Sequence, residues 1–315
     1  MSGLPVAVAA LAVVGALLVD RLFGEPARWH PVVGMGRYLA WAGRHVAPAA
    51  AGAAPRDMAA FARGALAWSV GALVCAALAW CLQSWLLRLH PLAAALALGL
   101  ALKPLLAWRM LRDETAAVEA ALGRSLAEGR ERLSRLVSRD TSALSESEVR
   151  ESAIESLAEN FNDSVIAPLF WFVVAGLPGA ALYRFANTAD AMWGYRGMRG
   201  GRCWEWAGKW TAHADYLLSW LPARLSAACL LLGAPVAAWR ALPGEAARTP
   251  SPNGGWPMGA MALRLGVRLG KPGHYLLFGQ GRVPEAADTA AALRCTAGIV
   301  AGLGMVALAI GLVRS

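Results

Sequence analysis

The sequence has few charged residues for its length of 315 residues. Asp, Glu, Lys and Arg make up 16% of it, whereas a soluble domain carries about 25%. Hydrophobic residues make up 57%, which excludes an ordinary soluble domain and predicts an integral membrane protein. The formal net charge of +9 suits cytoplasmic loops, anionic headgroups or phosphate-bearing ligands, and we expect no nucleic-acid partner.

Several common site signatures are also missing. The five cysteines show no CxxC spacing, so we interpret them as small buried hydrophobes rather than disulfides or metal ligands. The five histidines are scattered, which argues against a zinc site. The sequence contains no GxxxxGK[ST], GxSxG or kinase signature, and no period of 20–50 residues repeats. A familiar nucleotide or hydrolase motif is therefore excluded.

Apolar runs predict an all-α, polytopic membrane helical bundle with about five spans, forming one integral membrane domain over residues 1–315. The clearest runs cover residues 4–19, 65–87, 91–108, 216–239 and 296–313. A further run, 165–182, contains Pro168, Gly176 and Pro178, and it predicts either a kinked span or a re-entrant pair of half-helices, of which we favour the second. An apolar stripe over 109–137 predicts a cytoplasmic amphipathic helix, packed on the core or lying at the membrane surface.

Carboxylates gather in the stretch 138–197. Ser145 and Glu148 form a capping box, which predicts a helix that starts at Ser145. Polar side chains then recur about every four residues on one slowly drifting face. They are Glu148, Ser152, Glu155, Glu159 and Asp163. A solvated face is the alternative, but the adjoining apolar run favours a site for a hard cation such as Mg²⁺.

A second candidate is the turn from Ser251 to Gly255, which precedes a short helix predicted from about Met258. The sequence predicts that the turn is rich in exposed backbone N–H groups. Such groups, together with the dipole of the following helix, favour an anion. We therefore expect this turn to be a candidate for binding phosphate.

Six longer motifs occur in order along the chain. They are DRLFGEPARWHPVVGMGR, SRDTSALSESEV, ESLAENFNDSVIAPLFW, PGAALYRFANTADAMWGY, DYLLSWLPARLS and SPNGGWPMGAMALRLGVRLG. Together they resemble the adenosylcobinamide-phosphate synthase family of cobalamin biosynthesis, an inner-membrane family of bacteria, over residues 20 to about 275. Departures from the family pattern include Arg184 in place of a usual Lys and Gly254 in place of Ala.

The resemblance implies amide formation, with ATP and Mg²⁺, between a carboxylate of the corrinoid cobyric acid and the amine of (R)-1-amino-2-propanol or its O-phosphate. The product would be adenosylcobinamide or its phosphate. The resemblance also implies a multi-pass protein of the bacterial inner (plasma) membrane, in contact with membrane lipid, with a cytoplasmic active site; a homo-oligomer is left open. The alternatives are a membrane transporter of a corrinoid or other anionic solute, and a non-catalytic membrane sensor or scaffold.

Residues are assigned from what this reaction needs, namely a metal ion, cations against phosphate and a base for the ammonium proton. Glu155, Glu159 and Asp163 are assigned to Mg²⁺ binding or general-base catalysis, and Asp190 is a further catalytic candidate. Expected substrate-binding residues are His30, Arg37, Asp140, Thr141, Asn160, Arg184, Asn187, Thr188, Arg224, Ser251 and Asn253, with Arg139 as a phosphate candidate. Structural alternatives are a turn cap at Asp140-Thr141, a helix cap at Asn187 and a loop-shaping role for His30.

Overall fold

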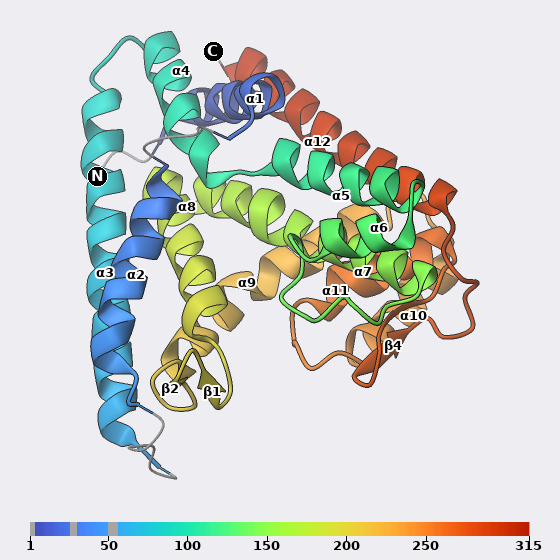
Figure 1. Cartoon of the computed structure of the whole chain (residues 1–315). Coiled ribbons are helices and arrows are strands. Elements are labelled where there is room, and N and C mark those ends of the chain that lie inside the picture. Colours follow the sequence, from blue (N-terminus) through green and yellow to red (C-terminus); the bar gives the residue numbers. More distant parts are fainter. Residues whose placement is uncertain (1–3, 26–29, 50–55, 315) are drawn as a thin grey trace. The chain divides into compact units, whose positions relative to one another are not determined.

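The computed structural model describes residues 4–25, 30–49 and 56–314, and within them it is helical apart from two short hairpins (Figure 1). The helices are α1 (Val6–Phe23), α2 (Pro31–Val46), α3 (Met58–Leu86), α4 (Pro91–Leu102), α5 (Trp108–Leu122), α6 (Leu126–Leu133), α7 (Glu146–Phe161), α8 (Ala167–Trp193), α9 (Lys209–Leu230), α10 (Val236–Ala246), α11 (Gly255–Leu265) and α12 (Ala286–Arg314). The shorter elements are η2 (Lys103–Leu105), η3 (Asn162–Ile166), β1 (Met198–Arg199), β2 (Arg202–Cys203), β3 (Leu269–Lys271) and β4 (Tyr275–Leu277). The all-α prediction is confirmed.

Five helical segments of the described chain are long and apolar enough to cross a membrane, which confirms the expected bundle. They are Val6–Phe23, Met58–Leu86, Pro91–Leu122, Glu146–Trp193 and Ala286–Arg314. In the fourth segment the apolar part is α8, because α7 carries six charged residues and lies outside the spanning part. The predicted span 216–239 is wrong as a continuous helix. The chain leaves α9 after Leu230 and turns through Gly233 (φ 78°) before α10 begins.

The chain forms two compact units, each assembled from segments that are distant in the sequence. Unit 1 comprises Met1–Leu106, Ala167–Ser219 and Ala307–Ser315, and unit 2 comprises Ala107–Ile166 and Trp220–Val306. Unit 1 therefore contains α1 to α4 and α8, whereas unit 2 contains α5, α6, α7, α10 and α11. The prediction of one integral membrane domain over residues 1–315 stays a prediction.

The broken helix α8 is the main irregularity of unit 1. Ala175 (φ −135°, ψ 17°) and Gly176 (φ 67°, ψ −161°) leave helical geometry, and the positive φ suits glycine. Gln83 Oε1 of α3 accepts a hydrogen bond from the backbone N–H of Leu177 at 2.7 Å, so one group released by the break has a partner. The interruption predicted for 165–182 is therefore present, and it falls at Gly176. A re-entrant course stays a prediction.

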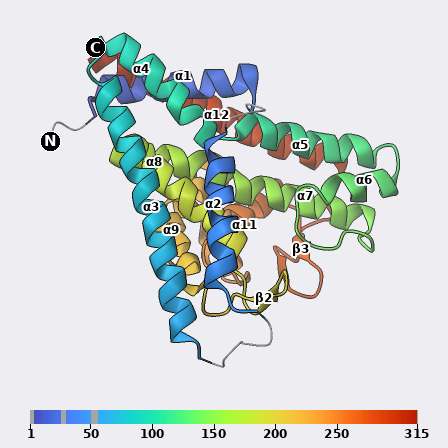
Figure 2. The ribbon, with the colours of Figure 1, turned by 60° about the vertical axis from the view of Figure 1, so that its left-hand side comes forward.

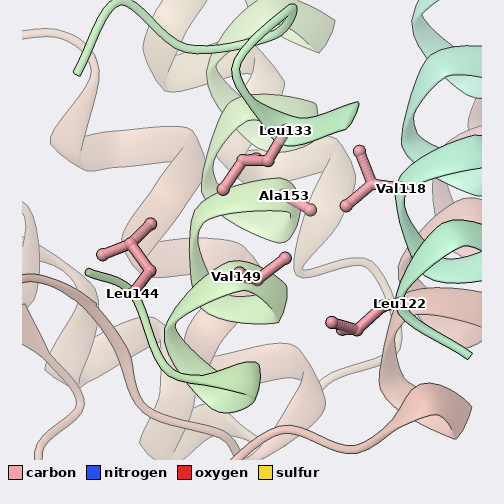
Figure 3. Packing of buried hydrophobic residues seen from close by; sticks show 6 residues of the cluster. All are labelled: Val118, Leu122, Leu133, Leu144, Val149 and Ala153. Atoms are coloured by element: carbon pink, nitrogen blue, oxygen red, sulfur yellow. The ribbon is translucent and has the colours of Figure 1, made fainter. Parts of the chain in front are cut away.

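Helices α5, α6 and α7 enclose the core of unit 2. Figure 3 shows the apolar side chains of these helices pointing toward one another. The apolar stripe of 109–137 therefore packs on the core, which decides between the two alternatives given for it. The single predicted helix is nevertheless two, because the chain turns after Leu122 and Ser125 caps α6 by accepting from the Glu128 N–H at 3.2 Å. This packing fixes α7, whose other side chains form the candidate site.

Candidate functional site

The carboxylates of α7 lie in the interior of unit 2. The predicted capping box is confirmed: Ser145 N–H donates to Glu148 Oε2 at 2.7 Å, and Ser145 Oγ accepts from the Glu148 N–H. Glu151 and Glu155, one turn apart, are only 4% and 2% exposed, and Glu159 on the next turn is half-buried. A solvated face is therefore wrong for this part of the helix.

Basic side chains compensate the buried carboxylates. Arg139 Nη2, from the loop before α7, donates to Glu155 Oε2 at 3.0 Å. Arg268 Nε lies 3.4 Å from Glu151 Oε1. Arg139 was a phosphate candidate, and the structure places it beside a predicted catalytic carboxylate.

The hairpin β3–β4 supplies two further residues that the sequence analysis missed. Lys271 pairs with Tyr275 across the hairpin, whose turn contains Gly273 with φ 74°. Burial raises the pKa of Glu155 and of Glu159, and the positive charge of Lys271 opposes this rise at both, as the Tyr275 hydroxyl does at Glu155. The signal in the sequence was a Pro-Gly turn flanked by a lysine and a tyrosine, which identifies a hairpin but not what it faces.

Burial shifts the titration of these groups. It raises the pKa of Glu159 to about 7, and the negative charges of Asp163 and Glu155 add to this shift. Burial also raises the pKa of Glu155 and of Glu151, against the opposing effects of Arg139 and Arg268 respectively. Glu159 therefore titrates close to neutral pH, where a general base is most effective.

Two buried atoms of the Arg139–Glu155 ion pair have no hydrogen-bond partner within the described chain. They are Glu155 Oε1 and Arg139 Nη1, which belong to the two sides of one ion pair. Buried polar atoms are normally satisfied by protein, water or ligand. An acceptor and a donor left open at the same place suit a ligand with both positive and negative groups.

The predicted phosphate turn lies against the same carboxylates. A Cβ atom added to Gly254 would lie 2.8 Å from Glu159 Oε1, so the turn and the carboxylate are in close contact. The expectation that its N–H groups are open is wrong for two of them. Ser251 Oγ accepts from the N–H of Gly254 at 2.9 Å and of Asn253 at 3.4 Å. Ser251 therefore shapes the turn, and α11 begins at Gly255, three residues earlier than predicted.

Arg224 connects this turn to α9. Its Nη1 donates to Asn253 Oδ1 at 2.8 Å, and its guanidinium lies 4.5 Å from the ring of Trp220 and 4.6 Å from that of Trp256. Cation–π contacts of this kind attract the guanidinium to the faces of the two rings. Arg224, Ser251 and Asn253 are thus brought together, and their role in binding substrate stays a prediction.

Other candidates from the acidic stretch have local partners. Asp140 is exposed and accepts from the Ser142 N–H at 2.8 Å, and Thr141 Oγ1 donates to the carbonyl of Arg130 at 3.0 Å. The structure thus shows the turn-capping alternative for this pair. Asn160 Nδ2 donates to the carbonyl of Ser156 within its own helix.

Asp163 lies in the π-helix η3, directly after α7. Asn162 Nδ2 donates to Asp163 Oδ1 at 2.8 Å. A π-helical turn changes the direction of the side chains that follow it, and such turns are frequent at functional sites. The four-residue spacing in the sequence did not reveal it.

The remaining candidates belong to unit 1. His30 caps α2 by accepting from the Val32 N–H at 3.2 Å, and its Nε2 donates to Glu25 Oε2 at 2.7 Å. Arg37 is exposed on α2. The second half of α8 carries four more candidates, Arg184, Asn187, Thr188 and Asp190. Thr188 Oγ1 donates to the carbonyl of Arg184. Their participation in a site with the carboxylates of unit 2 stays a prediction.

The described residues contain no group of three or more His, Cys, Asp or Glu side chains placed to hold a metal ion. Mg²⁺ usually binds through one or two carboxylates plus water and substrate phosphates. The open Glu155 Oε1 and the neighbouring carboxylates of Glu159 and Asp163 supply oxygen ligands of this kind. The residues therefore fit an ion that arrives with a phosphate, rather than a closed protein cage.

Together, these features define a helical, multi-pass membrane protein with a buried acidic site compensated by basic side chains. Residues 13–300 match the family model described as CobD/Cbib protein, and the chain belongs to that family. Its predicted resemblance to a family of cobalamin biosynthesis is confirmed.

Two curated relatives illustrate the similarity. The chain is 42% identical over 285 residues to the cobalamin biosynthesis protein CobD of Chromobacterium violaceum, covering 82% of this chain and 81% of that protein. It is 38% identical over 281 residues to the probable cobalamin biosynthesis protein CobD of Pyrococcus furiosus, covering 89% of this chain and 90% of that protein. No solved structure matches the chain. The protein therefore functions in cobalamin biosynthesis.

Proposed function

We propose that the protein joins a carboxylate of cobyric acid, or of its adenosylated form, to the amine of (R)-1-amino-2-propanol or its O-phosphate, using ATP. The observation that supports this proposal is the set of buried carboxylates on α7, faced by Arg139 and Lys271. Such a site offers both a base for an ammonium group and cations for a phosphate. Membership of a cobalamin biosynthesis family supports the choice of a corrinoid.

The reaction needs activation because a carboxylate oxygen is a poor leaving group. Attack of the carboxylate on the γ-phosphorus of ATP forms an acyl phosphate and releases ADP. The amine nitrogen then attacks the carbonyl carbon and inorganic phosphate leaves, so the nitrogen must lose a proton to a base. The site must therefore neutralise phosphate charge in one step and accept a proton in the next.

Glu159 is the proposed base. Its pKa of about 7 allows it to be ionised at neutral pH and still accept a proton from the ammonium group. Its position against Gly254 holds the carboxylate at the phosphate turn. The open Arg139 Nη1 and the ammonium of Lys271 are the proposed contacts for phosphate oxygens.

One or two of the carboxylates of Glu155, Glu159 and Asp163 would hold Mg²⁺, with substrate phosphate completing the site. When bound, the ion would supply positive charge to the phosphate oxygens. Arg139 pairs with the second oxygen of Glu155 and opposes the rise in the pKa of Glu155 that burial causes. Arg224 and Asn253 would orient a phosphate or amide of the substrate at the edge of the turn.

The test is an assay of the purified protein with cobyric acid, ATP, Mg²⁺ and the amine with and without its phosphate, with products followed by mass spectrometry. Glu159→Gln should lower the rate of amide formation by roughly 10²–10⁴-fold, the usual contribution of a general base. Glu146→Gln, on the exposed first turn of the same helix, is the matched control and should keep the wild-type rate.

Three results would contradict the proposal. Equal rates for wild type and Glu159→Gln would remove the assigned base. Absence of product under every substrate combination would favour a sensor or scaffold. Uptake of a corrinoid into proteoliposomes without ATP would favour a transporter.

A further inference from the structure

Unit 1 contains an apolar groove that the proposed reaction does not use. Its volume is about 550 Å³, and it lies between α2, α3, α4, η2 and α8. Its lining includes Gly34 and Tyr38 of α2, and Gly71, Cys75 and Ala79 of α3. The Tyr38 hydroxyl already donates to the carbonyl of Ala67 at 2.6 Å, so it has no free proton to offer to a ligand in the groove. A groove with so few polar partners suits an apolar occupant.

The groove lies beside the lipid-facing surface of a membrane helix. Val74, Leu78 and Leu82 line it, and each is also strongly exposed, between 41% and 67%. These residues belong to Met58–Leu86, one of the five segments able to cross a membrane. Exposed aliphatic side chains on such a helix face hydrocarbon, so the groove is open to the acyl chains of the bilayer.

The length of the groove matches one leaflet. Along α3 its lining runs from Gly71 to Leu82, which at 1.5 Å per residue spans about 16 Å. Half the hydrocarbon core of a bilayer is about 15 Å thick. Gly71 lies near the middle of α3 and Leu82 near its C-terminal end, so the groove covers one half of the span. Figure 2 shows α2 running alongside α3 over this part of unit 1.

We propose that this groove binds one acyl chain of a membrane phospholipid. An empty groove would leave its lining without van der Waals partners on one side, and the surrounding lipid is the apolar material at hand. A shape limited to one leaflet favours an acyl chain over a membrane-spanning helix of a second copy. The bound lipid would fill the space between α2, α3 and α8.

Gly34→Leu tests the proposal by filling the groove. A Cβ atom at Gly34 would meet no atom within 4 Å, so the leucine has space to enter without displacing backbone. Replacing a helical glycine also favours the helix. Gly302→Leu on α12, where a Cβ likewise meets nothing, is the matched control away from the groove.

The measurement is native mass spectrometry of protein purified in mild detergent with a phosphatidylethanolamine that carries 16- and 18-carbon chains. Wild type and Gly302→Leu should retain one phospholipid per chain, and Gly34→Leu should lose it. An independent measurement is labelling by an apolar maleimide: added phospholipid should slow the reaction of Cys75 in the groove, but not of Cys81, exposed on the same helix.

The proposal would be overturned by wild-type protein without a lipid adduct, by equal retention in Gly34→Leu, or by unchanged labelling of Cys75. A dimer of the wild type that Gly34→Leu separates, with no lipid bound, would show instead that a second copy occupies the groove.

Discussion

At the scale of single residues, the ionisation of Glu159 couples the site to pH. Its folded-state pKa of about 7 lies above the ordinary value of 4.5. The protonated carboxyl therefore favours the fold, and this contribution is fully present below pH 4.5 and is lost as the pH rises through 7. The ionised form, which the proposed reaction requires, is the one that burial disfavours.

Glu159→Gln should remove this dependence, because the amide resembles the protonated carboxyl in shape and charge. In detergent without metal or substrate, we expect the variant to melt at the wild-type temperature near pH 4.5 and at a higher temperature at pH 8. Thermal unfolding measured at both pH values tests this. Glu146→Gln should show no such difference between the two pH values, and an equal shift of Glu159→Gln at both would contradict the pKa argument.

The ion pair of Arg139 and Glu155 makes a second prediction at this scale. Arg139→Gln leaves the buried Glu155 carboxylate without its partner, and we expect a loss of about 3–5 kcal/mol of stability. The double variant Arg139→Gln/Glu155→Gln has no buried charge at this place and should regain most of that loss. Denaturant unfolding measures both.

Activity separates the two roles of this pair. If Arg139 and Glu155 only hold the fold together, the double variant should recover activity along with stability. If Arg139 contacts phosphate and Glu155 binds the metal ion, as proposed, the double variant should be stable but inactive. A stable and active double variant would therefore exclude Arg139 and Glu155 from the chemistry.

At the scale of elements, patterns among neighbouring residues predicted α7. Contacts between residues that are distant in the sequence could not be seen in it. The capping box at Ser145 and the spacing of Glu151, Glu155 and Glu159 depend on neighbouring residues, so the sequence contained them. Lys271 and Tyr275 come more than 100 residues later, and only tertiary packing brings their hairpin to α7. The π-helical turn at Asp163 depends in the same way on packing rather than on residue type.

The break in α8 leads to a third prediction. Gln83→Leu removes the acceptor of the Leu177 N–H, which lies next to Gly176 at membrane depth. A buried donor left without a partner should cost about 1–3 kcal/mol. Thermal unfolding in detergent measures this loss, and Gln280→Leu, at an exposed loop position, is the control. A wild-type melting temperature for Gln83→Leu would show that the break does not depend on this hydrogen bond.

At the scale of the whole molecule, the order of motifs in the sequence does not reveal which of them share a unit. The acidic helix and the turn at Ser251 are about 100 residues apart, yet both belong to unit 2. The acidic helix and Asn187 are much closer in sequence but belong to different units. The order of residues in the chain therefore could not identify the partners of the carboxylates. Hydropathy, which is a local property, did identify apolar segments, although the predicted span 216–239 was wrong.

The distribution of basic residues predicts the side of the membrane on which unit 2 presents its site. The segments 109–139 and 248–282 of unit 2 contain many Arg and Lys residues, and the stretch 21–63 around α2 contains six arginines. Such segments remain on the cytoplasmic side. We therefore expect the hairpin that carries Lys271 to be cytoplasmic, and the short turn at His90 between α3 and α4 to lie on the opposite side.

Single cysteines test this topology in a protein whose native cysteines are replaced by serine. His274→Cys, at the exposed tip of the hairpin, should react with a membrane-impermeant maleimide in inside-out vesicles and not in right-side-out vesicles. His90→Cys should show the reverse pattern, because the span α3 separates it from the basic stretch 21–63. Labelling of His274→Cys from the outside would place the carboxylates away from cytoplasmic ATP and would leave the proposed ligation without its energy source.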